Sequence, residues 1–404
     1  MDTRQPLKIL LLTTSFPLTR ESRSGIFVRT MIEHLPDKVQ VTVLTPDDSS
    51  TEQPDLPGKY SLVPFRYAPK KWQQLAHGSG GIVAALSRNK FLLFLLPPFL
   101  FSCLLTCCRE TRRADVLHAN WSINGVIAGI AGLLFRRPVI TTLRGSDVNL
   151  TAKSGLMRQL VRFCLICSRH IVTVSPSLKA TLVKQFPQYS SKISVVANGI
   201  DQAFFSAGEK KESPERKAIR FLYAGNLVPG KGVHCILEAA ASLAAPAANN
   251  WLLDIVGDGP ERDKLEAYCQ KNRLENKVIF HGSVAPEEVP QFMARADVFV
   301  FASFAEGRPN AVLEAMASGL PVIVGAIPAV LELIENGEQG LLFSPGDAGI
   351  LAEHMLFLIN SPAERRKMGR KAREAIRAMG LSWQEAARQY AEIYMEVTRQ
   401  SSSL

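Results

Sequence analysis

The sequence lacks the patterns of several common protein classes. Its seven cysteines cannot all pair, and no cleavage pattern follows the short apolar run at residues 9–12, so neither a secreted disulfide framework nor a signal peptide is expected. No basic run carries interleaved aromatic residues, which argues against nucleic acid as a partner. No Gly-X-Gly-X-X-Gly follows the first apolar run, which disfavours a nicotinamide oxidoreductase. We therefore expect a cytoplasmic chain whose cysteines serve in packing.

Length and composition predict a globular protein of two domains. The chain has 404 residues, of which 47% are apolar and 21% charged, and one core rarely serves so many residues. Its net charge of +10 is uneven, because residues 1–200 hold 25 Lys and Arg against 11 Asp and Glu. A basic half attracts anionic partners. We expect it to meet a lipid-linked or lipid-phosphate acceptor and an anionic membrane surface.

Residues 91–108 form an uncharged run that just reaches the length of a membrane span. Pro97 and Pro98 interrupt this run, and the apolar runs on either side of it read as strands of one sheet. A true span would place those strands on opposite sides of a bilayer. We therefore expect a buried or membrane-touching helix pair.

Short apolar runs alternate with amphipathic segments along both halves, which is the pattern of parallel sheets covered by helices on both faces. The pattern predicts an α/β protein with two Rossmann-like domains, at residues 1–197 and 198–380. A final helix at residues 381–404 is expected to pack back toward the first domain, and the charged residues 210–217 read as a linker or exposed loop. Such sheets bind ligands at the carboxyl ends of their strands, so a central cleft between the domains is expected.

The most informative segment, residues 303–322, reads strand, loop, helix, strand. Pro309 suits the first helical position, where its missing N–H costs nothing. The N–H groups around Asn310 would then form an anion site that suits a diphosphate. Glu306 precedes this site and Glu314 lies about one turn into the helix, so the two carboxylates could bind hydroxyl groups on both sides of the diphosphate.

This segment resembles glycosyltransferase family 4, a group of retaining enzymes of GT-B fold that includes many bacterial polysaccharide and lipid glycosyltransferases. The resemblance covers nearly the whole chain, and its most specific part is the pair of glutamates separated by seven residues. It implies that Glu306 contacts hydroxyls of the donor sugar and that Glu314 binds the ribose. The donor site would also include Gly307, Arg308, Pro309 and Asn310.

A second match to the family lies at residues 224–233, Ala-Gly-Asn-Leu-Val-Pro-Gly-Lys-Gly-Val. Lys231 matches a lysine that holds the diphosphate. Asn226 stands where the family usually has arginine, and our hypothesis is that Arg308 substitutes for that arginine. The Gly-Asp-Gly loop around Asp258 resembles a family loop near the nucleotide, although Asp258 is equally well explained as a helix N-cap.

The first half supplies two further candidates. His118 ends a strand, at a position where similar proteins place a histidine beside the donor sugar. Gly25 lies in a loop that would approach the donor phosphate or the acceptor. Two departures accompany them: Arg144 stands where the family has a histidine, and Pro328 and Ala329 replace a common pair of glycines.

The expected activity is retaining transfer of a sugar from a nucleotide-diphosphate sugar to a glycan or lipid-linked acceptor, with Glu306, His118 and Lys231 as catalytic candidates. The enzyme would serve cell-surface polysaccharide synthesis as a peripheral protein at the cytoplasmic face of the inner membrane. No cofactor or metal is expected, because no Asp-X-Asp pair stands in a plausible metal position. Two alternatives stay open: a sugar-nucleotide epimerase of the same fold, and a non-enzymatic membrane-associated binding protein.

Overall fold

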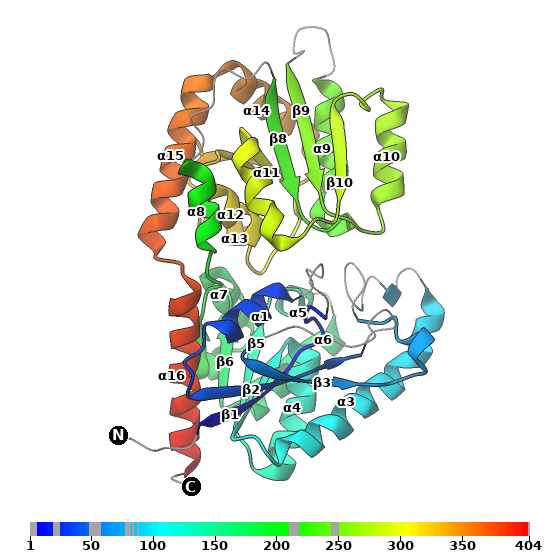
Figure 1. Ribbon diagram of the computed structural model, residues 1–404, viewed down its shortest axis with the longest axis vertical. Coiled ribbons are helices and arrows are strands. Elements are labelled where there is room, and N and C mark those ends of the chain that lie inside the picture. Colours follow the sequence, from blue (N-terminus) through cyan, green and yellow to red (C-terminus); the bar gives the residue numbers. More distant parts are fainter. Residues whose placement is uncertain are drawn as a thin grey trace. The chain divides into compact units, whose positions relative to one another are not determined.

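The computed structural model divides the chain into two compact units (Figure 1). Unit 1 is Met1–Gly199 together with Ser382–Leu404, and unit 2 is Ile200–Leu381. The structure describes residues 6–18, 25–47, 58–76, 82, 85–86, 89–152, 154–209, 218–243 and 250–402. The predicted linker at residues 210–217 lies outside these ranges.

Unit 1 is built on a parallel sheet of seven strands in the order β3-β2-β1-β4-β5-β6-β7. The strand order changes direction between β1 and β4, which is the point where sheets of this kind bind ligands. The strands are β1 (Leu7–Leu12), β2 (Val39–Pro46), β3 (Tyr60–Phe65), β4 (Val116–Asn120), β5 (Val139–Leu143), β6 (His170–Thr173) and β7 (Ile193–Val195).

Strand β1 is apolar on both faces because helices cover both sides of the sheet. Ile9 and Leu11 pack in one cluster with α1 and α16, whereas Leu10 and Leu12 pack in another with α3 and α4. The helices of unit 1 are α1 (Ile26–Glu33), α3 (Leu96–Thr111), α4 (Ser122–Phe135), α5 (Ser146–Leu150), α6 (Gly155–Cys167), α7 (Pro176–Gln185) and α16 (Trp383–Ser402), with 3-10 turns η1 (Lys70–Trp72), η2 (Lys90–Leu95) and η3 (Pro187–Lys192).

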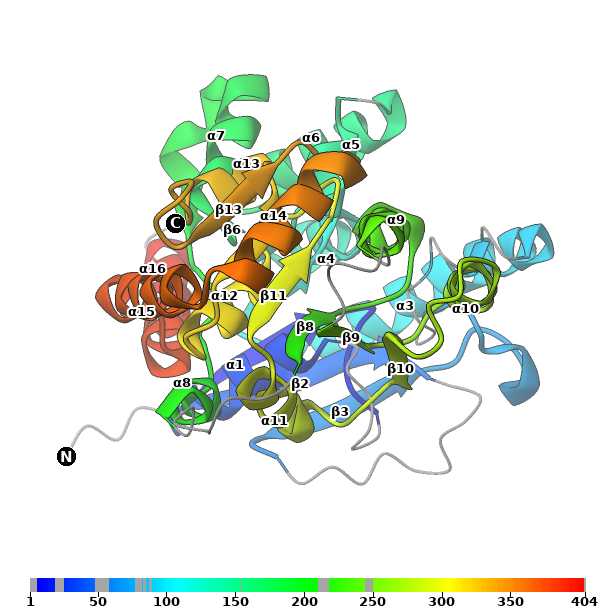
Figure 2. The ribbon, with the colours of Figure 1, turned by 90° about the horizontal axis from the view of Figure 1, so that it is seen from above.

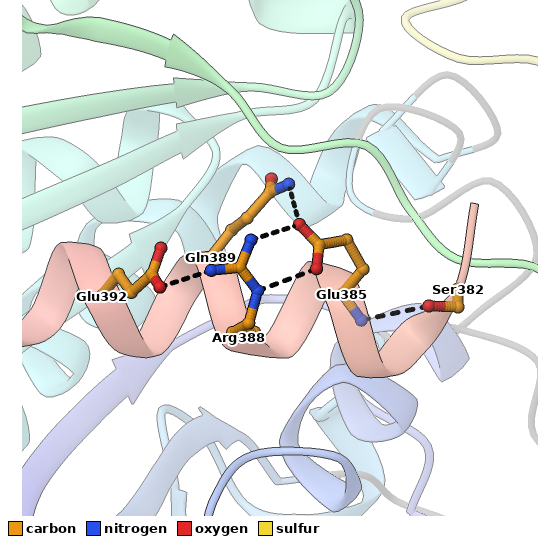
Figure 3. A network of polar contacts seen from close by, with 5 residues as sticks. All are labelled: Ser382, Glu385, Arg388, Gln389 and Glu392. Carbon is orange, nitrogen blue, oxygen red and sulfur yellow. Dashed lines mark hydrogen bonds and ion pairs between the residues drawn. The ribbon is translucent and has the colours of Figure 1, made fainter. Parts of the chain in front are cut away.

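Helix α16, the last element of the chain, packs on the sheet of unit 1 through small and aromatic side chains that share a cluster with β1. Its outer face carries a polar network (Figure 3) in which Arg388 pairs with Glu385 at 2.7 Å and with Glu392. The hydrogen bonds from Arg388 and Gln389 lower the pKa of Glu385 to about 2. The backbone N–H of Glu385 also donates to Ser382 Oγ at 3.1 Å, as at a helix N-cap.

Unit 2 is built on a parallel sheet of six strands in the order β10-β9-β8-β11-β12-β13. Figure 2 shows α9, α10 and α14 on one side of this sheet and α8, α11, α12 and α15 on the other. The strands are β8 (Ile219–Ala224), β9 (Trp251–Val256), β10 (Val278–Gly282), β11 (Val298–Phe301), β12 (Val322–Gly325) and β13 (Gly340–Phe343). The helices are α8 (Gln202–Glu209), α9 (Val233–Ser242), α10 (Arg262–Lys271), α11 (Val289–Arg295), α12 (Asn310–Ala317), α13 (Pro328–Leu331), α14 (Ala348–Asn360) and α15 (Pro362–Met379), with turns η4 (Pro229–Lys231) and η5 (Pro286–Glu288).

The apolar run at residues 91–108 forms η2 and most of α3. Pro97 and Pro98 lie in the first turn of α3, and the run is divided there into η2 and α3, as expected. Among the described residues, Lys90–Thr111 is the one helix long and apolar enough to cross a membrane, and only 17% of its apolar window is buried. The expectation of a buried helix pair is therefore wrong, and contact with a membrane stays a prediction.

The seven cysteines are free, and five of them are buried. Cys103 and Cys107 lie on the inner face of α3 in the cluster with Leu10 and Leu12. Burial raises the pKa of Cys107 to about 12, so its thiol stays protonated at neutral pH. The cysteines pack as small apolar side chains, as expected.

Candidate functional site

Three loops meet at the carboxyl ends of β8, β9 and β11 in unit 2. The first two loops are joined by backbone hydrogen bonds from Leu227 N to Asp258 O at 3.0 Å and from Glu261 N to Leu227 O at 3.1 Å. The first and third loops are joined by Phe304 N, which donates to Gly230 O at 3.0 Å. These bonds hold the three loops as one surface at the ligand-binding edge of the sheet.

Two glycines permit this close approach of the loops. Gly232 has φ +64°, and a Cβ at that position would lie 2.2 Å from the carbonyl oxygen of Ala302. Gly257 has φ +140°, and its Cβ would lie 1.8 Å from the carbonyl oxygen of Gly225. No other residue type fits either position without moving the backbone. The glycines after Lys231 and before Asp258 therefore serve the packing of the loops.

Lys231 and Glu306 form an ion pair across the first and third loops. Lys231 ends η4, and Glu306 lies between β11 and α12. The two side chains are 27% and 12% exposed, and the Lys231 ammonium lies 5.7 Å from the ring centroid of Phe301. The structure thus joins two of the three predicted catalytic residues in one partly buried contact.

Two residues missed by sequence reasoning support this pair. Tyr223 is fully buried, and its hydroxyl donates to Asn226 O at 3.0 Å. Burial, and then the charge of Glu306, raise the pKa of Tyr223. Ser303 Oγ donates to Gly230 O at 3.1 Å, which ties the third loop to the first. Their one sequence signal is a polar group at or just beyond the end of an apolar strand.

Helix α12 begins at Asn310, and Pro309 is its N-cap residue. Pro309 thus lies one position earlier than expected, and its carbonyl accepts from Val312 N at 3.0 Å. The first turn of α12 lies directly after Glu306 and Gly307 in sequence, and its positive dipole end suits an anion. Glu314 is half-buried one turn into a helix whose other residues from Val312 to Ala317 are buried. The predicted helix start is confirmed within one residue, and binding of a diphosphate there stays a prediction.

Arg308 lies just before α12 and is partly buried. Burial lowers the pKa of Arg308 to about 10, and the negative charge of Glu332 acts in the opposite direction. The guanidinium therefore stays charged at neutral pH. Pro328 and Ala329, which stand in place of the expected glycines, open the short helix α13 next to Glu332. Contact of Arg308 with a diphosphate stays a prediction.

Asn226 and Asp258 contribute to the hydrogen bonds of this loop surface with their backbone carbonyl groups, which accept from Tyr223 and Leu227. The Asn226 side chain is exposed. Asp258 Oδ1 accepts from Gly259 N at 2.7 Å and lies 4.0 Å from Arg262. Helix α10 begins at Arg262 with Glu261 as its N-cap residue. The explanation of Asp258 as a helix N-cap is therefore wrong.

His118 is fully buried in the middle of β4 in unit 1, so the expectation that it ends a strand is wrong. Its Nδ1 lies 2.7 Å from the hydroxyl of Tyr394 on α16, and its Nε2 lies 2.8 Å from Thr142 Oγ1 on β5. Burial, and then the charge of Arg144, lower the pKa of His118 to about 3. Both ring nitrogens thus have partners inside unit 1. A catalytic role for His118 stays a prediction that requires one of these bonds to be exchanged.

Arg144 lies at the carboxyl edge of the sheet of unit 1. Its guanidinium donates to Asn120 Oδ1 at 3.0 and 2.7 Å and to Asn198 Oδ1 at 3.1 Å. It also lies over the ring of Phe27, 4.3 Å from the centroid. Gly25, with φ +73°, is the N-cap residue of α1 in this unit. Of these residues, Asn120 ends β4, one of the two strands between which the strand order reverses.

The described residues contain no group of three or more His, Cys, Asp and Glu side chains that could hold a metal ion. The groups that the loops of unit 2 do present are a lysine, an arginine, carboxylates and a helix N-terminus. Such a set can bind an anion at its centre and hydroxyl groups at its sides.

Two family models match the chain. Residues 24–204 match the model described as Glycosyltransferase Family 4, and residues 206–375 match the model described as Glycosyl transferases group 1. The first lies in unit 1 with a short extension, and the second lies in unit 2. The second match contains every donor-site candidate except Gly25.

Individual proteins and solved structures are also similar to this chain. The N-acetyl-alpha-D-glucosaminyl L-malate synthase of Bacillus anthracis is 27% identical over 77% of this chain and 83% of its own. The UDP-Gal:alpha-D-GlcNAc-diphosphoundecaprenol alpha-1,3-galactosyltransferase of Escherichia coli is 29% identical over 59% of this chain and 64% of its own. The structure of Anabaena HepE in complex with UDP and glucose matches with a TM-score of 0.73 and 22% identity, over 96% of this chain and 99% of that one. The fold is therefore GT-B, as expected.

Proposed function

The chain belongs to glycosyltransferase family 4, and we propose that this nucleotide-sugar-dependent enzyme transfers a hexose with retention of configuration to a glycan or lipid-linked acceptor. The observation that carries the proposal is the ion pair of Lys231 and Glu306 on the loop surface that leads into α12. An anion site flanked by carboxylates fits a diphosphate with a sugar at one end and a ribose at the other.

The ion pair suggests how the donor binds. The donor diphosphate attracts the Lys231 ammonium, which then exchanges its partner from Glu306 to a phosphate oxygen. Glu306 is thereby released to accept hydrogen bonds from hydroxyls of the donor sugar, and Glu314 receives the ribose. Because the lysine is paired before and after this exchange, no buried charge is left alone at any stage.

The reaction breaks the bond between the anomeric carbon and the diphosphate oxygen, and negative charge develops on that oxygen. Lys231, Arg308 and the first turn of α12 would stabilise this charge, because all three are in place before the reaction begins. The acceptor hydroxyl attacks from the face that the diphosphate leaves: its oxygen forms the new bond to the anomeric carbon, and its proton passes to the departing diphosphate oxygen. These protein groups suffice for the leaving diphosphate, so we propose that the enzyme needs neither metal nor cofactor and stays active in EDTA.

The acceptor in this proposal is a glycan or a lipid-linked glycan of the cell surface. Its support is the excess of basic residues in the first half of the chain, which favours a phosphorylated acceptor and an anionic membrane surface. The similar Escherichia coli enzyme carries a diphosphoundecaprenol substrate in its name. We therefore place the enzyme in the cytoplasm, as a peripheral protein on the inner membrane.

A thermal-shift screen of UDP-, GDP- and ADP-sugars tests the donor site. At a ligand concentration of 100 times Kd, binding stabilises the folded state by about 2.7 kcal/mol, so sugars of one nucleotide should raise the unfolding temperature. Glu306→Ala should abolish transfer while the protein stays folded. Stabilisation by none of the donors, or full transfer by the variant, would overturn the proposal. Loss of activity in EDTA with recovery in manganese would overturn its metal-independent part.

A further inference from the structure

Unit 1 exposes a set of large apolar side chains on η2 and on α3 as far as Leu105. We call this set the α3 surface. Its six members are each between 41% and 79% exposed: Phe91, Leu93, Phe94, Leu100, Phe101 and Leu105. A soluble surface rarely gathers so many large apolar side chains within fifteen residues, and such patches mark interaction sites. The opposite face of the same helix packs in the core, where Phe99, Cys103 and Cys107 are buried.

The α3 surface lies at the carboxyl edge of the sheet of unit 1. Ser102 Oγ donates to the carbonyl oxygen of Arg66, the residue after β3, at 2.6 Å. The Phe99 ring packs edge-on against Phe65, the last residue of β3, at 5.1 Å. The first half of α3 (Figure 1) therefore lies beside the strand ends where this type of sheet binds ligands. A carrier lipid held by the same membrane would present its glycan at that edge.

The charge around the α3 surface complements an anionic layer. In the sequence between Gly58 and Ala114 there are nine Lys and Arg and one acidic residue, Glu110. Two of these cations are neutralised by acids outside this range, Lys59 by Asp37 and Arg66 by Asp47. Lys70 and Lys71 are exposed beside Trp72, which is 64% exposed, in the loop after β3. Tyr67 in the same loop packs against Phe99 at 5.0 Å, so this loop adjoins the first half of α3.

The second half of α3 ends in exposed cations. Lys90 is exposed at the start of η2, and Arg109, Arg112 and Arg113 are exposed at the far end of the helix. An apolar surface bordered by cations is the pattern of a helix that lies in the interface of an anionic bilayer. A protein partner would not require this excess of positive charge.

We infer that the α3 surface inserts into the interfacial layer of an anionic bilayer and lies in its plane without spanning it. A span is excluded because β3 and β4, on either side of this segment, belong to one sheet. The inference deepens the proposed function and rests on it in one respect, the lipid-linked acceptor. Membrane contact would bring the carboxyl edge of the sheet to the carrier.

Flotation of the full chain with vesicles tests the inference. Vesicles of phosphatidylcholine with 30% phosphatidylglycerol are compared with phosphatidylcholine alone. The wild type should partition onto the anionic vesicles at least tenfold better than onto the neutral ones. Phe94→Ser/Phe101→Ser should lower partition onto the anionic vesicles at least tenfold. Leu356→Ser/Phe357→Ser, which changes an apolar pair on α14 of unit 2 that is 40% and 43% exposed, is the control and should bind as the wild type does.

Wild-type binding by Phe94→Ser/Phe101→Ser would overturn the inference, as would equal loss in the control or equal partition onto neutral vesicles. Circular dichroism and the thermal shift with the selected nucleotide sugar show whether each variant is folded and binds the donor. A variant that binds the donor but not the vesicles supports the inference. Failure of the wild type to bind any donor, with normal vesicle binding, would count against the proposed function alone.

Discussion

Variants that break the contact between Lys231 and Glu306 show whether the pair acts in catalysis or only stabilises the fold. The side chains are 27% and 12% exposed. A fully exposed salt bridge contributes about 0–1 kcal/mol to stability, whereas removing one partner of a buried salt bridge costs about 3–5 kcal/mol. This pair lies between the two cases. We expect Lys231→Met and Glu306→Gln each to lower the free energy of unfolding by about 1–2 kcal/mol. The double variant should lose less than the sum, because neither charge is left alone.

The loss of activity should behave differently from the loss of stability, because the second substitution should restore no activity. A hydrogen bond from Lys231 to the diphosphate contributes about 1.5–3 kcal/mol, which corresponds to about 10-fold to 150-fold in kcat/KM for Lys231→Met. Glu306→Gln should be at least as severe, and the double variant should be no better than either single one. Urea unfolding gives the stabilities, and release of the nucleoside diphosphate gives the rates.

Lys264→Met is the matched control, because Lys264 pairs with Glu261 at 3.6 Å on α10 and its side chain is 80% exposed. It should change stability by less than about 0.5 kcal/mol and leave kcat/KM unchanged. A catalytic role for the pair is ruled out if Lys231→Met and Glu306→Gln lose stability as expected but keep the wild-type kcat/KM. The pair would then be a structural salt bridge that holds the two loops together.

Three other predictions concern single side chains. The pKa of His118 is lowered from 6.5 to about 3 by burial, so the unfolded chain binds a proton between these values that the folded chain does not. The free energy of unfolding should therefore fall as pH falls below 6.5, by about 1.4 kcal/mol per pH unit from this group. Urea unfolding at pH 6.5 and at pH 5 should show a smaller fall for His118→Gln than for the wild type. Equal falls in the two proteins would contradict this. Gly257→Ala places a Cβ 1.8 Å from a carbonyl oxygen, so it should destabilise unit 2 by more than about 1 kcal/mol, and an unchanged urea midpoint would contradict it. Arg308→Ala should lower kcat/KM by about tenfold or more, and unchanged turnover would remove Arg308 from the diphosphate site.

The loops that carry Lys231 and Glu306 and the start of α12 could be predicted because their residues lie within two sequence segments. The spacing of Glu306, Pro309 and Glu314 fixes a loop followed by a helix, and Lys231 lies in a glycine turn after a strand. A parallel sheet brings such loops to one edge whatever the details of its core. The contact of Lys231 with Glu306, 75 residues apart, follows from that geometry.

The remaining features depend on contacts that no local pattern records. His118 reads as a polar residue at a strand end, and its burial depends on Tyr394, 276 residues away. Tyr223 stands in an apolar strand just before the motif at residues 224–233 and is not part of it. Residues 91–108 are apolar in a way that fits either a buried or an exposed helix, and only packing decides between these. Phe99 faces the core whereas Phe94 and Phe101 do not.

Proton NMR of the transfer reaction is the measurement that tests the central claim most directly. The nucleotide sugar selected by the thermal-shift screen is incubated with enzyme and acceptor, and the anomeric proton of the first product is compared with that of the donor. We expect a glycoside with the configuration of the donor, formed by the wild type and not by Glu306→Ala. A product of inverted configuration, or an epimerised nucleotide sugar without transfer, would contradict it.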